Sequence, residues 1–277
     1  MQDKTVVITG ATSGIGAVAA EKLAAMGARI VFIARDRDRG EATQARLRGL
    51  GPGLAHRVFY ADLSLVSETR RVGAEIAAAE PRIDVLINNA GAIFGRREMT
   101  KEGLELTFAL NHMSYFVLAK ALRERLMASA PARVINTSSE AHRGATIHFD
   151  DLQFARNYGG MSAYQRSKLC NILFTRELSR RLAGKGVTSN CLHPGFVNTR
   201  FGDAAKGGWR YLLQIGKNFA ISPEKGAETI IFLASAGEVA GVTGEYFFRC
   251  RKKTTTREAL DDVAARRLWE ESEKICK

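Results

Sequence analysis

Seven short apolar runs recur along the chain, and the longer stretches between them carry apolar residues at helical spacing. The runs are rich in Val, Ile and Phe and nearly continuous, which is typical of strands covered on both faces. They comprise residues 5–9, 29–33, 56–60, 84–88, 133–138, 187–192 and 245–248. This alternation predicts a parallel sheet with helices on both faces, joined by right-handed crossovers.

The chain has 277 residues and shows neither a linker nor an internal repeat, so we expect residues 1–277 to form one α/β domain. The predicted fold is doubly wound and Rossmann-like, around a seven-stranded parallel sheet. Two stretches interrupt the alternation, at 140–160 and 195–221. Long loops inside compact domains are often functional, so we expect both to contribute to substrate binding. Residues 256–275 predict an amphipathic terminal helix.

Composition narrows the classes of function. The net charge of +12 fits an acidic ligand, but the basic residues are scattered and only 249–253 is dense, so we expect no nucleic-acid partner. Four cysteines and five histidines lack disulfide or metal-ligand spacing, which favours a reducing compartment and no metal. No apolar stretch has the length of a membrane span, and the chain begins directly with a strand. We therefore expect a cytoplasmic protein without signal peptide or anchor.

The sequence TGATSGIG, at 9–16, follows the first apolar run and precedes a helical pattern. A helix N-terminus has free N–H groups and a partial positive charge, so it attracts phosphate. Glycine lets the backbone approach such a group closely. Gly10, Gly14 and Gly16, with Ser13 and Ile15 between them, therefore predict a cradle for the diphosphate of a dinucleotide. A tight turn that binds nothing is the alternative.

The end of the second strand bears on the choice of cofactor. An acidic residue there would bind the ribose hydroxyls of NAD, whereas here Ala34 is followed by Arg35. Because arginine makes bidentate contacts with phosphate, we predict NADP (NADPH) rather than NAD. An exposed Arg35, or an inward-turned Asp36, is the alternative. After the third strand, Asp62 and its neighbour Leu63 are placed at the adenine, although a turn or a helix cap fits Asp62 equally well.

Tyr164 and Lys168 lie four residues apart in a helical pattern, which places them on one face. A free tyrosine has a pKa of about 10, too high for a base at neutral pH. An ammonium about 4 Å away, at an effective dielectric of about 20, favours the phenolate by roughly 4 kcal/mol. That corresponds to a pKa lower by about three, while burial opposes the change. Tyr164 can then exchange a proton with an alcohol or carbonyl while a cofactor moves the hydride.

The motif T-G-x-x-x-G-x-G, with NNAG at 88–91 and YQRSK at 164–168, resembles the short-chain dehydrogenase/reductase family over essentially the whole chain. Within that family, YQRSKLCNILFTRELSRRL, IHFDDL and RRLWEESEKI are similar to retinol-dehydrogenase-like members. The resemblance implies an NAD(P)-dependent alcohol dehydrogenase or carbonyl reductase. Relatives commonly pair through helices, which implies a homodimer or homotetramer.

The resemblance also assigns roles to single residues. Ser139, after the fifth strand, would hydrogen-bond the substrate oxygen, with loop capping as the alternative. Asn111 matches the fourth catalytic residue of the family, which supports a water bridge to the lysine; the pattern alone makes it a neutral helix residue. The remaining cofactor contacts implied are the adenosine side at Asn89, Ala90 and Gly91, a sharp turn at Pro194 and Gly195, and the nicotinamide carboxamide at Val197 and Thr199.

Aromatic side chains in the predicted loops favour an apolar substrate pocket, with core or interface packing as the alternative. They are Phe94, Tyr158, Phe196, Trp209 and Tyr211. The predicted function is hydride transfer between NADP and a small apolar alcohol or carbonyl compound, with 195–221 as a lid if it closes over substrate. Two alternatives remain open. One is an enone or protochlorophyllide-like reductase of a carbon–carbon double bond, and the other is a non-catalytic NADP-binding regulator.

Overall fold

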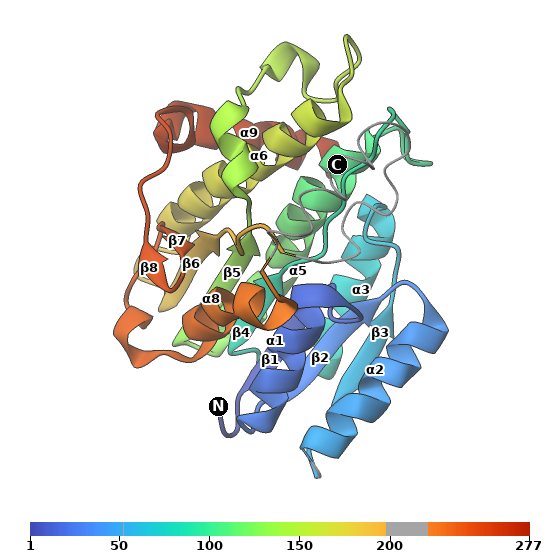
Figure 1. The fold of residues 1–277 in the computed structure, drawn as a ribbon, viewed down its shortest axis with the longest axis vertical. Helices are drawn as coiled ribbons and strands as arrows, with labels where there is room; N and C mark the ends of the chain where they lie inside the picture. Colours follow the sequence, from blue (N-terminus) through green and yellow to red (C-terminus); the bar gives the residue numbers. More distant parts are fainter. Residues whose placement is uncertain (52, 198–220) are drawn as a thin grey trace.

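The computed structural model describes residues 1–51, 53–197 and 221–277. Within these residues the strands form one sheet in the order β3-β2-β1-β4-β5-β6-β7-β8 (Figure 1). The strands are β1 (Thr5–Thr9), β2 (Arg29–Ala34), β3 (Arg57–Tyr60), β4 (Val85–Asn88), β5 (Ala132–Thr137), β6 (Val187–Leu192), β7 (Tyr246–Phe248) and β8 (Arg251–Lys252). The seven predicted strands are confirmed, and β1 to β7 pair in parallel.

The eighth strand corrects the prediction of a seven-stranded, wholly parallel sheet. β8 pairs antiparallel with β7, opposite Phe247 and Phe248. Arg249 and Cys250 form the connection and both have positive φ, at 48° and 60°. Two such residues in succession are what a tight hairpin turn requires, because their twist matches that of the strands. β8 itself is two exposed basic residues at the sheet edge, so it has no apolar pattern to reveal it.

Helices cover both faces of the sheet, as the doubly wound prediction requires (Figure 1). Val6 and Ile8 of β1 pack in one buried cluster, with residues of α1 (Gly14–Ala25), α2 (Arg37–Leu50) and α8 (Pro223–Ser235). Val7, between them, packs in the other cluster, with α3 (Val66–Ala79), α5 (Ser114–Ala128) and α6 (Gly160–Arg181). Successive side chains of a strand point to opposite faces, so each strand contributes to both cores.

The predicted terminal helix begins later than expected. The segment 258–260 is a short 3-10 turn, η6 (Glu258–Leu260), and α9 (Asp262–Ile275) follows it. Asp261 caps α9 by accepting hydrogen bonds from the backbone N–H groups of Val263 and Ala264, both at 2.9 Å. α9 lies along α6 (Figure 1), where the Trp269 ring stacks on Phe174 with centroids 5.9 Å apart.

Short helical segments fill the connections that follow the carboxyl ends of β4 and β5. They are α4 (Leu106–Phe108), the π-helix η1 (Ala109–Met113), η2 (Glu140–Gly144) and η3 (Phe149–Asp151); a further one, η5 (Gly237–Val239), follows α8 before β7. Within the described ranges, the helices are all too short or too polar to cross a bilayer. The same ranges contain no group of three or more His, Cys, Asp or Glu side chains that could hold a metal ion.

Candidate active site

In the glycine motif, close backbone contacts leave no room for a side chain at Gly10 or Gly16. Gly10 has φ of +72° and ends β1. A Cβ on Gly16 would lie 2.2 Å from the Gly10 carbonyl oxygen and 2.4 Å from Asn89 Nδ2. α1 begins at Gly14, and Ser13 before it is extended and makes no side-chain capping bond. The first N–H groups of α1 are therefore left without a cap from Ser13, as an anion-binding helix start requires.

Asn89 ties the glycine turn to the ends of two other strands. Its backbone N–H donates to Thr9 Oγ1 at 2.9 Å, and its Nδ2 donates to the Thr9 carbonyl at 3.2 Å. The Thr137 hydroxyl, at the end of β5, donates to Asn89 Oδ1 at 3.4 Å. The predicted cofactor residues at 10–16 and 89–91 are thus in direct contact, at the carboxyl edge of β1, β4 and β5.

Asp36 does not turn inward. Its carboxylate caps α2 by accepting a hydrogen bond from the backbone N–H of Arg39 at 2.8 Å. Arg35 is exposed beside it. The Arg39 side chain reaches back to the glycine turn and donates to the Thr12 carbonyl at 3.4 Å. The sequence analysis did not single out Arg39. The available signal was the alternation RDRDR at 35–39, which places three arginines around the start of α2.

Asp62 adopts the turn role that the sequence left open. Its Oδ1 accepts hydrogen bonds from the Ser64 backbone N–H at 3.0 Å and from the Ser64 hydroxyl at 2.7 Å. Leu63 is buried in the core cluster that includes α3 and α5. The carboxylate therefore already serves a local turn, which by itself accounts for an aspartate at this position.

Tyr164 and Lys168 lie together on α6, and both side chains are buried. The Lys168 ammonium is 5.6 Å from the centroid of the Tyr164 ring and donates to the Thr137 carbonyl at 3.1 Å. A Cβ on Gly91 would come within 3.4 Å of Lys168 Nζ and 3.1 Å of Asn111 Oδ1. The backbone after β4 thus runs directly against two of the predicted catalytic residues.

The pKa of Tyr164 differs from the sequence expectation. Burial raises the pKa of Tyr164 to about 12, and a side-chain hydrogen bond with Ser139 acts in the opposite direction. Burial also lowers the pKa of Lys168 to about 7. The expected lowering assumed an ammonium about 4 Å from the phenol oxygen, whereas here the loss of hydration is the largest effect and outweighs the Ser139 hydrogen bond. In the protein alone, Tyr164 therefore holds its proton at neutral pH.

Ser139 is the serine that contacts Tyr164. Its neighbour Ser138 is buried and donates to the Lys168 carbonyl at 2.8 Å. Ser139 hydrogen-bonds the Tyr164 side chain, and its Oγ also accepts from the Ala141 backbone N–H at 3.2 Å. The loop-capping alternative is therefore present, and the same side chain contacts Tyr164, while the expected bond to a substrate oxygen stays a prediction.

Asn111 lies in the π-helix η1, which follows directly from α4. Its amide makes a reciprocal pair with the Ala92 backbone, with both bonds at 2.9 Å, and Nδ2 also donates to Ser167 Oγ at 3.0 Å. π-helical turns are rare and occur frequently at functional sites. The apolar pattern carries no sign of this extra residue, and only the family resemblance singled out Asn111.

The turn after β6 returns the chain toward the glycine motif. Gly195 has φ of +92°, and its N–H donates to His193 Nδ1 at 3.2 Å. A Cβ on Gly226 of α8 would lie 2.7 Å from Val197 and 2.8 Å from Ile15. Val197 therefore lies near the start of α1, and Pro194 precedes Gly195 in the same turn; the role of Val197 at the nicotinamide carboxamide stays a prediction. Thr199 lies outside the described residues.

The predicted substrate residues differ in their surroundings. The Tyr158 hydroxyl contacts the Phe94 carbonyl at 3.1 Å, Glu105 Oε1 at 3.3 Å and Thr107 Oγ1 at 3.3 Å. Tyr158 thus links the loop at Phe94 to the start of α4, and its role at the substrate stays a prediction. Phe196 is 52% exposed at the end of β6. Trp209 and Tyr211 lie outside the described residues, as does most of 195–221.

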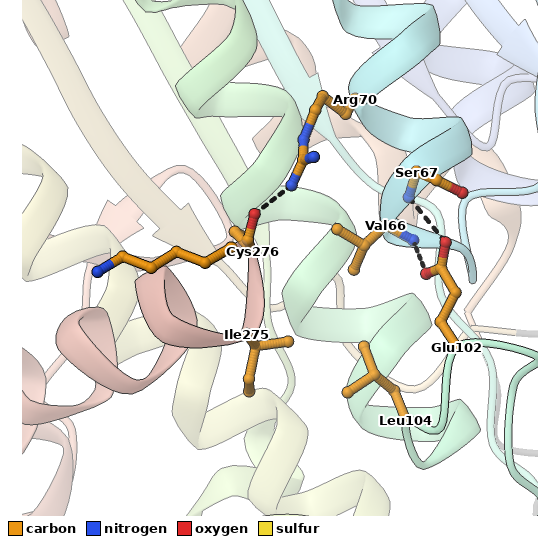
Figure 2. A pocket seen from close by; sticks show the side chains of 8 residues that line it. Val66, Ser67, Arg70, Glu102, Leu104, Ile275 and Cys276 are labelled. Atoms are coloured by element: carbon orange, nitrogen blue, oxygen red, sulfur yellow. Dashed lines mark hydrogen bonds between the residues drawn. The ribbon is translucent and has the colours of Figure 1, made fainter.

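A separate cavity of about 190 Å³ lies between the start of α3 and the end of α9 (Figure 2). Its polar groups are already paired. Glu102 accepts from the Ser67 backbone N–H at 3.0 Å, and Arg70 donates to the Cys276 carbonyl. No predicted site residue is in its lining, which consists of Val66, Ser67, Arg70, Glu102, Leu104, Ile275, Cys276 and Lys277. The cavity is therefore not the predicted catalytic site.

The sequence and the fold are both similar to those of known proteins. Residues 4–207 match the family described as short chain dehydrogenase. Retinol dehydrogenase 13 of Homo sapiens is 42% identical over 280 residues, which cover 98% of this chain and 84% of the relative. Retinol dehydrogenase 14 of Homo sapiens is 40% identical over 296 residues, which cover 99% of this chain and 86% of the relative.

Solved structures share the arrangement of helices and strands. A crystal structure of an uncharacterized protein from Mycobacterium Paratuberculosis has a TM-score of 0.79 and 32% identity, covering 99% of this chain and 94% of that chain. A short chain dehydrogenase from Burkholderia cenocepacia J2315, in complex with NADP, has a TM-score of 0.71 and 25% identity. That match covers 89% of this chain and 96% of the other.

Proposed function

Because the chain belongs to the short-chain dehydrogenase family, we propose that it transfers a hydride between NADP and an apolar alcohol or carbonyl compound. Membership makes the protein an NAD(P)-dependent short-chain dehydrogenase. The finer proposal depends on one observation above all. Tyr164, hydrogen-bonded to Ser139, is buried beside Lys168 at the strand ends that also carry the glycine turn. Open α/β sheets bind their ligands at this edge.

The residues present fit a dinucleotide. A Cβ at Gly16 would clash with the Gly10 carbonyl oxygen, so only glycine lets the start of α1 pack this closely against the turn after β1. In the proposal Gly10, Gly14 and Gly16 hold the diphosphate with Ser13 and Ile15, and Asn89 to Gly91 line the adenosine side. The turn from Pro194 to Val197 holds the nicotinamide side. When bound, the nicotinamide supplies or accepts the hydride.

The protein's own groups supply the proton and the orientation. Tyr164, with a pKa raised to about 12 by burial, keeps its proton at neutral pH and can donate it to a carbonyl oxygen. The Ser139 hydroxyl, bonded to the same phenol, would hold that oxygen in place. Lys168 is fixed by the Thr137 carbonyl, and Asn111 fixes the backbone of Ala92 next to Gly91. The four side chains thus form one connected region.

The preference for NADP rests on the start of α2. Asp36 is engaged as a helix cap, Arg39 donates to the Thr12 carbonyl of the glycine turn, and Arg35 is exposed next to Asp36. The solved dehydrogenase from Burkholderia cenocepacia holds NADP. Asp62 and Leu63 remain proposed for the adenine, with the turn at Ser64 as a second use of the carboxylate.

The substrate proposed is a small apolar alcohol or its carbonyl. The relatives are named for retinol, an apolar alcohol, and Phe94, Phe196 and the stretch 195–221 supply the proposed pocket. We further propose that residues 1–277 form one domain, with 140–160 and 195–221 as its substrate loops. A cytoplasmic location and a helix-paired homodimer or homotetramer complete the proposal.

The test is a screen of the purified protein with NADPH and NADH against aldehydes, ketones and enones, and with NADP and NAD against alcohols. We expect NADPH consumption with apolar aldehydes or ketones, and the reverse reaction with the matching alcohols. Turnover only with enones would replace the proposal with double-bond reduction. Tight NADPH binding without turnover on any compound would make the protein a cofactor-binding regulator.

A further inference from the structure

Glu140 follows Ser139 at the end of β5, and its carboxylate contacts side chains from separate parts of the chain. Arg143 Nε, three residues on, donates to Oε1 at 2.6 Å. Lys253, just after β8, lies with its ammonium 3.1 Å from both oxygens. The hydroxyl of Tyr246, in β7, donates to Oε2 at 3.3 Å. One carboxylate thus joins the end of β5 to the sheet edge at β7 and β8.

The end of β6 meets the same carboxylate through His193. Its Nε2 lies 3.2 Å from Glu140 Oε2, and its ring stacks on Phe248 with centroids 4.0 Å apart. Nδ1 of the same ring accepts the Gly195 N–H at 3.2 Å. Glu140 is therefore packed against the turn that the proposed function assigns to the nicotinamide side.

His142 holds the Ser139 backbone from a third direction. This buried ring has Nδ1 2.6 Å from the Ser139 carbonyl oxygen and Nε2 2.7 Å from Thr255 Oγ1. Since a carbonyl can only accept, Nδ1 carries the proton and Nε2 accepts from the threonine hydroxyl. Ser139 is thus anchored through its own carbonyl and through the side chain of the next residue.

The Glu140 carboxylate is ionised at neutral pH. Burial raises the pKa of Glu140, but hydrogen bonds from Lys253 and Arg143 and the nearby positive charges outweigh it and lower the pKa to about 2. Hydrogen bonds to an ionised carboxylate are stronger than neutral ones. The Glu140 side chain is 41% exposed, so solvent weakens each of these bonds. The ordering of the loop therefore depends on several segments that bond to the same carboxylate.

We propose that Glu140 is a positioning residue, which fixes the Ser139 hydroxyl relative to Tyr164 by fastening the end of β5 to β7, to Lys253 and to the turn after β6. It acts through Ser139 and touches neither substrate nor cofactor. The inference rests on the proposed function, in which Ser139 binds the substrate oxygen. Its structural part, the ordering of the loop at 139–145, can be tested without any turnover.

The first experiment measures hydrogen exchange in Glu140→Gln, with Glu68→Gln as the matched control. Glu68 also pairs with an arginine three residues on, Arg71, and its side chain is 37% exposed, but it lies on α3. We expect amides of 139–145 to exchange about tenfold faster in Glu140→Gln, because local opening becomes easier. Glu68→Gln should leave those amides unchanged. Unchanged exchange in Glu140→Gln would overturn the proposal.

The second experiment is a kinetic cycle with Ser139→Ala, Glu140→Gln and the double variant. We expect kcat of Glu140→Gln to fall about tenfold, since small misplacements near reacting groups are costly. The Kd for NADPH, from fluorescence quenching, should stay within about twofold. In the Ser139→Ala background, Glu140→Gln should lower kcat by no more than about a further twofold, because its effect depends on Ser139. An equal loss in both backgrounds would show that Glu140 does not act through Ser139.

The two experiments separate this inference from the proposed function. If the wild-type protein turns over no compound of the screen, the proposed function fails, and the exchange measurement alone decides whether Glu140 orders the loop. If the wild type is active but Glu140→Gln keeps wild-type exchange and kcat, the function stands and the positioning role is overturned.

Discussion

Burial, more than charge, sets the protonation of the two central side chains. It raises the pKa of Tyr164 to about 12 and lowers that of Lys168 to about 7, so the neutral form of each is favoured. At pH 7 the phenol is protonated, and burial favours the neutral amine far more than in a free lysine. A protonated phenol next to Ser139 can donate a proton to a carbonyl oxygen, which is the role that the proposed function gives to Tyr164.

Replacing Tyr164 with phenylalanine removes the proton donor and keeps the ring. We expect Tyr164→Phe to lower kcat by about 100-fold or more, the usual size of a general acid–base contribution. The Kd for NADPH should stay within about twofold. Tyr60→Phe, the same change outside the predicted site, is the control and should keep its kcat. Steady-state kinetics and fluorescence titration measure both quantities, and a Tyr164→Phe variant with wild-type kcat would exclude this residue as the acid.

The choice between the two nicotinamide cofactors can be tested at Arg35. Arg35→Asp introduces a carboxylate that repels a 2′-phosphate and accepts hydrogen bonds from ribose hydroxyls. We expect the ratio of kcat/KM for NADPH over NADH to fall by about 10-fold or more. Arg48→Asp, in the last turn of α2, is the control for charge. If Arg35→Asp leaves the ratio unaltered, Arg35 does not bind the 2′-phosphate. Arg39→Ala then shows whether Arg39 binds it.

At the scale of elements, one aromatic cluster attaches α9 to the rest of the protein. The Trp269 ring packs edge-on against Phe116 of α5, with centroids 4.8 Å apart, and stacks on Phe174 of α6. The Arg181 guanidinium lies over its other side, 4.4 Å from the centroid. His112 of η1 adds a bond to Ser272 at 2.9 Å. α9 thus supports the helices that carry Asn111 and Tyr164.

Truncating the tryptophan should loosen this attachment. Trp269 is 9% exposed, so Trp269→Ala leaves a large cavity, and we expect the free energy of unfolding to fall by about 3–5 kcal/mol. Leu260→Ala, at a residue 50% exposed just before α9, should change it by less than about 0.5 kcal/mol. Urea denaturation followed by circular dichroism measures both. Equal, small changes in the two variants would contradict a stabilising role for the cluster.

The elements that the sequence predicted well are those whose pattern comes from burial. Strands such as Val85–Asn88 are continuous apolar runs because helices cover both of their faces. β8 was missed because Arg251 and Lys252 form an exposed edge. The π-helix around Asn111 was missed because it is only five residues long, too short to show a periodicity of its own.

The site was predictable where spacing or backbone freedom carries the chemistry. Tyr164 and Lys168 stand one helical turn apart, and Gly16 is fixed by a contact that admits no Cβ. The hydrogen-bond partner of a hydroxyl group depends on residues distant in the sequence, and so does the effect of burial on the pKa of Tyr164. For that reason neither the Glu105 partner of Tyr158 nor the raised pKa of Tyr164 could be derived from local pattern.

For the whole molecule, charge and buried bases favour stability at alkaline rather than acidic pH. The chain carries a net charge of +12 at pH 7, and its pI is about 9.8, so raising the pH reduces self-repulsion. Burial lowers the pKa of His112 to about 3, of His193 to about 4 and of Lys168 to about 7. In each case the unfolded chain binds protons that the folded protein excludes.

The resulting pH dependence of stability has a definite sign. Where the unfolded state binds more protons, the free energy of unfolding rises with pH. For His112 that window runs from about pH 3 to its ordinary pKa of 6.5, and for Lys168 from about 7 to 10.5. The opposite effect of Tyr164, whose pKa is raised from 10 to about 12, begins only above pH 10. The buried thiols of Cys170 and Cys191, whose pKa burial raises from 9.0 to about 12, act in the same direction as Tyr164 but from about pH 9. We therefore expect maximal stability near about pH 8.5, just above the usual pH 5–8.

His112→Gln tests the acidic side of this dependence. Between pH 6 and 4 each excluded proton contributes a slope of about 1.4 kcal/mol per pH unit. Removing His112 should therefore lower the slope of the free energy of unfolding against pH by the contribution of about one proton. This holds even if the variant is less stable overall because its bond to Ser272 is lost. His148→Gln, at an exposed histidine, should keep the wild-type slope. Urea denaturation across the pH range measures the slopes, and equal slopes for His112→Gln and wild type would show that His112 takes up its proton inside the folded protein.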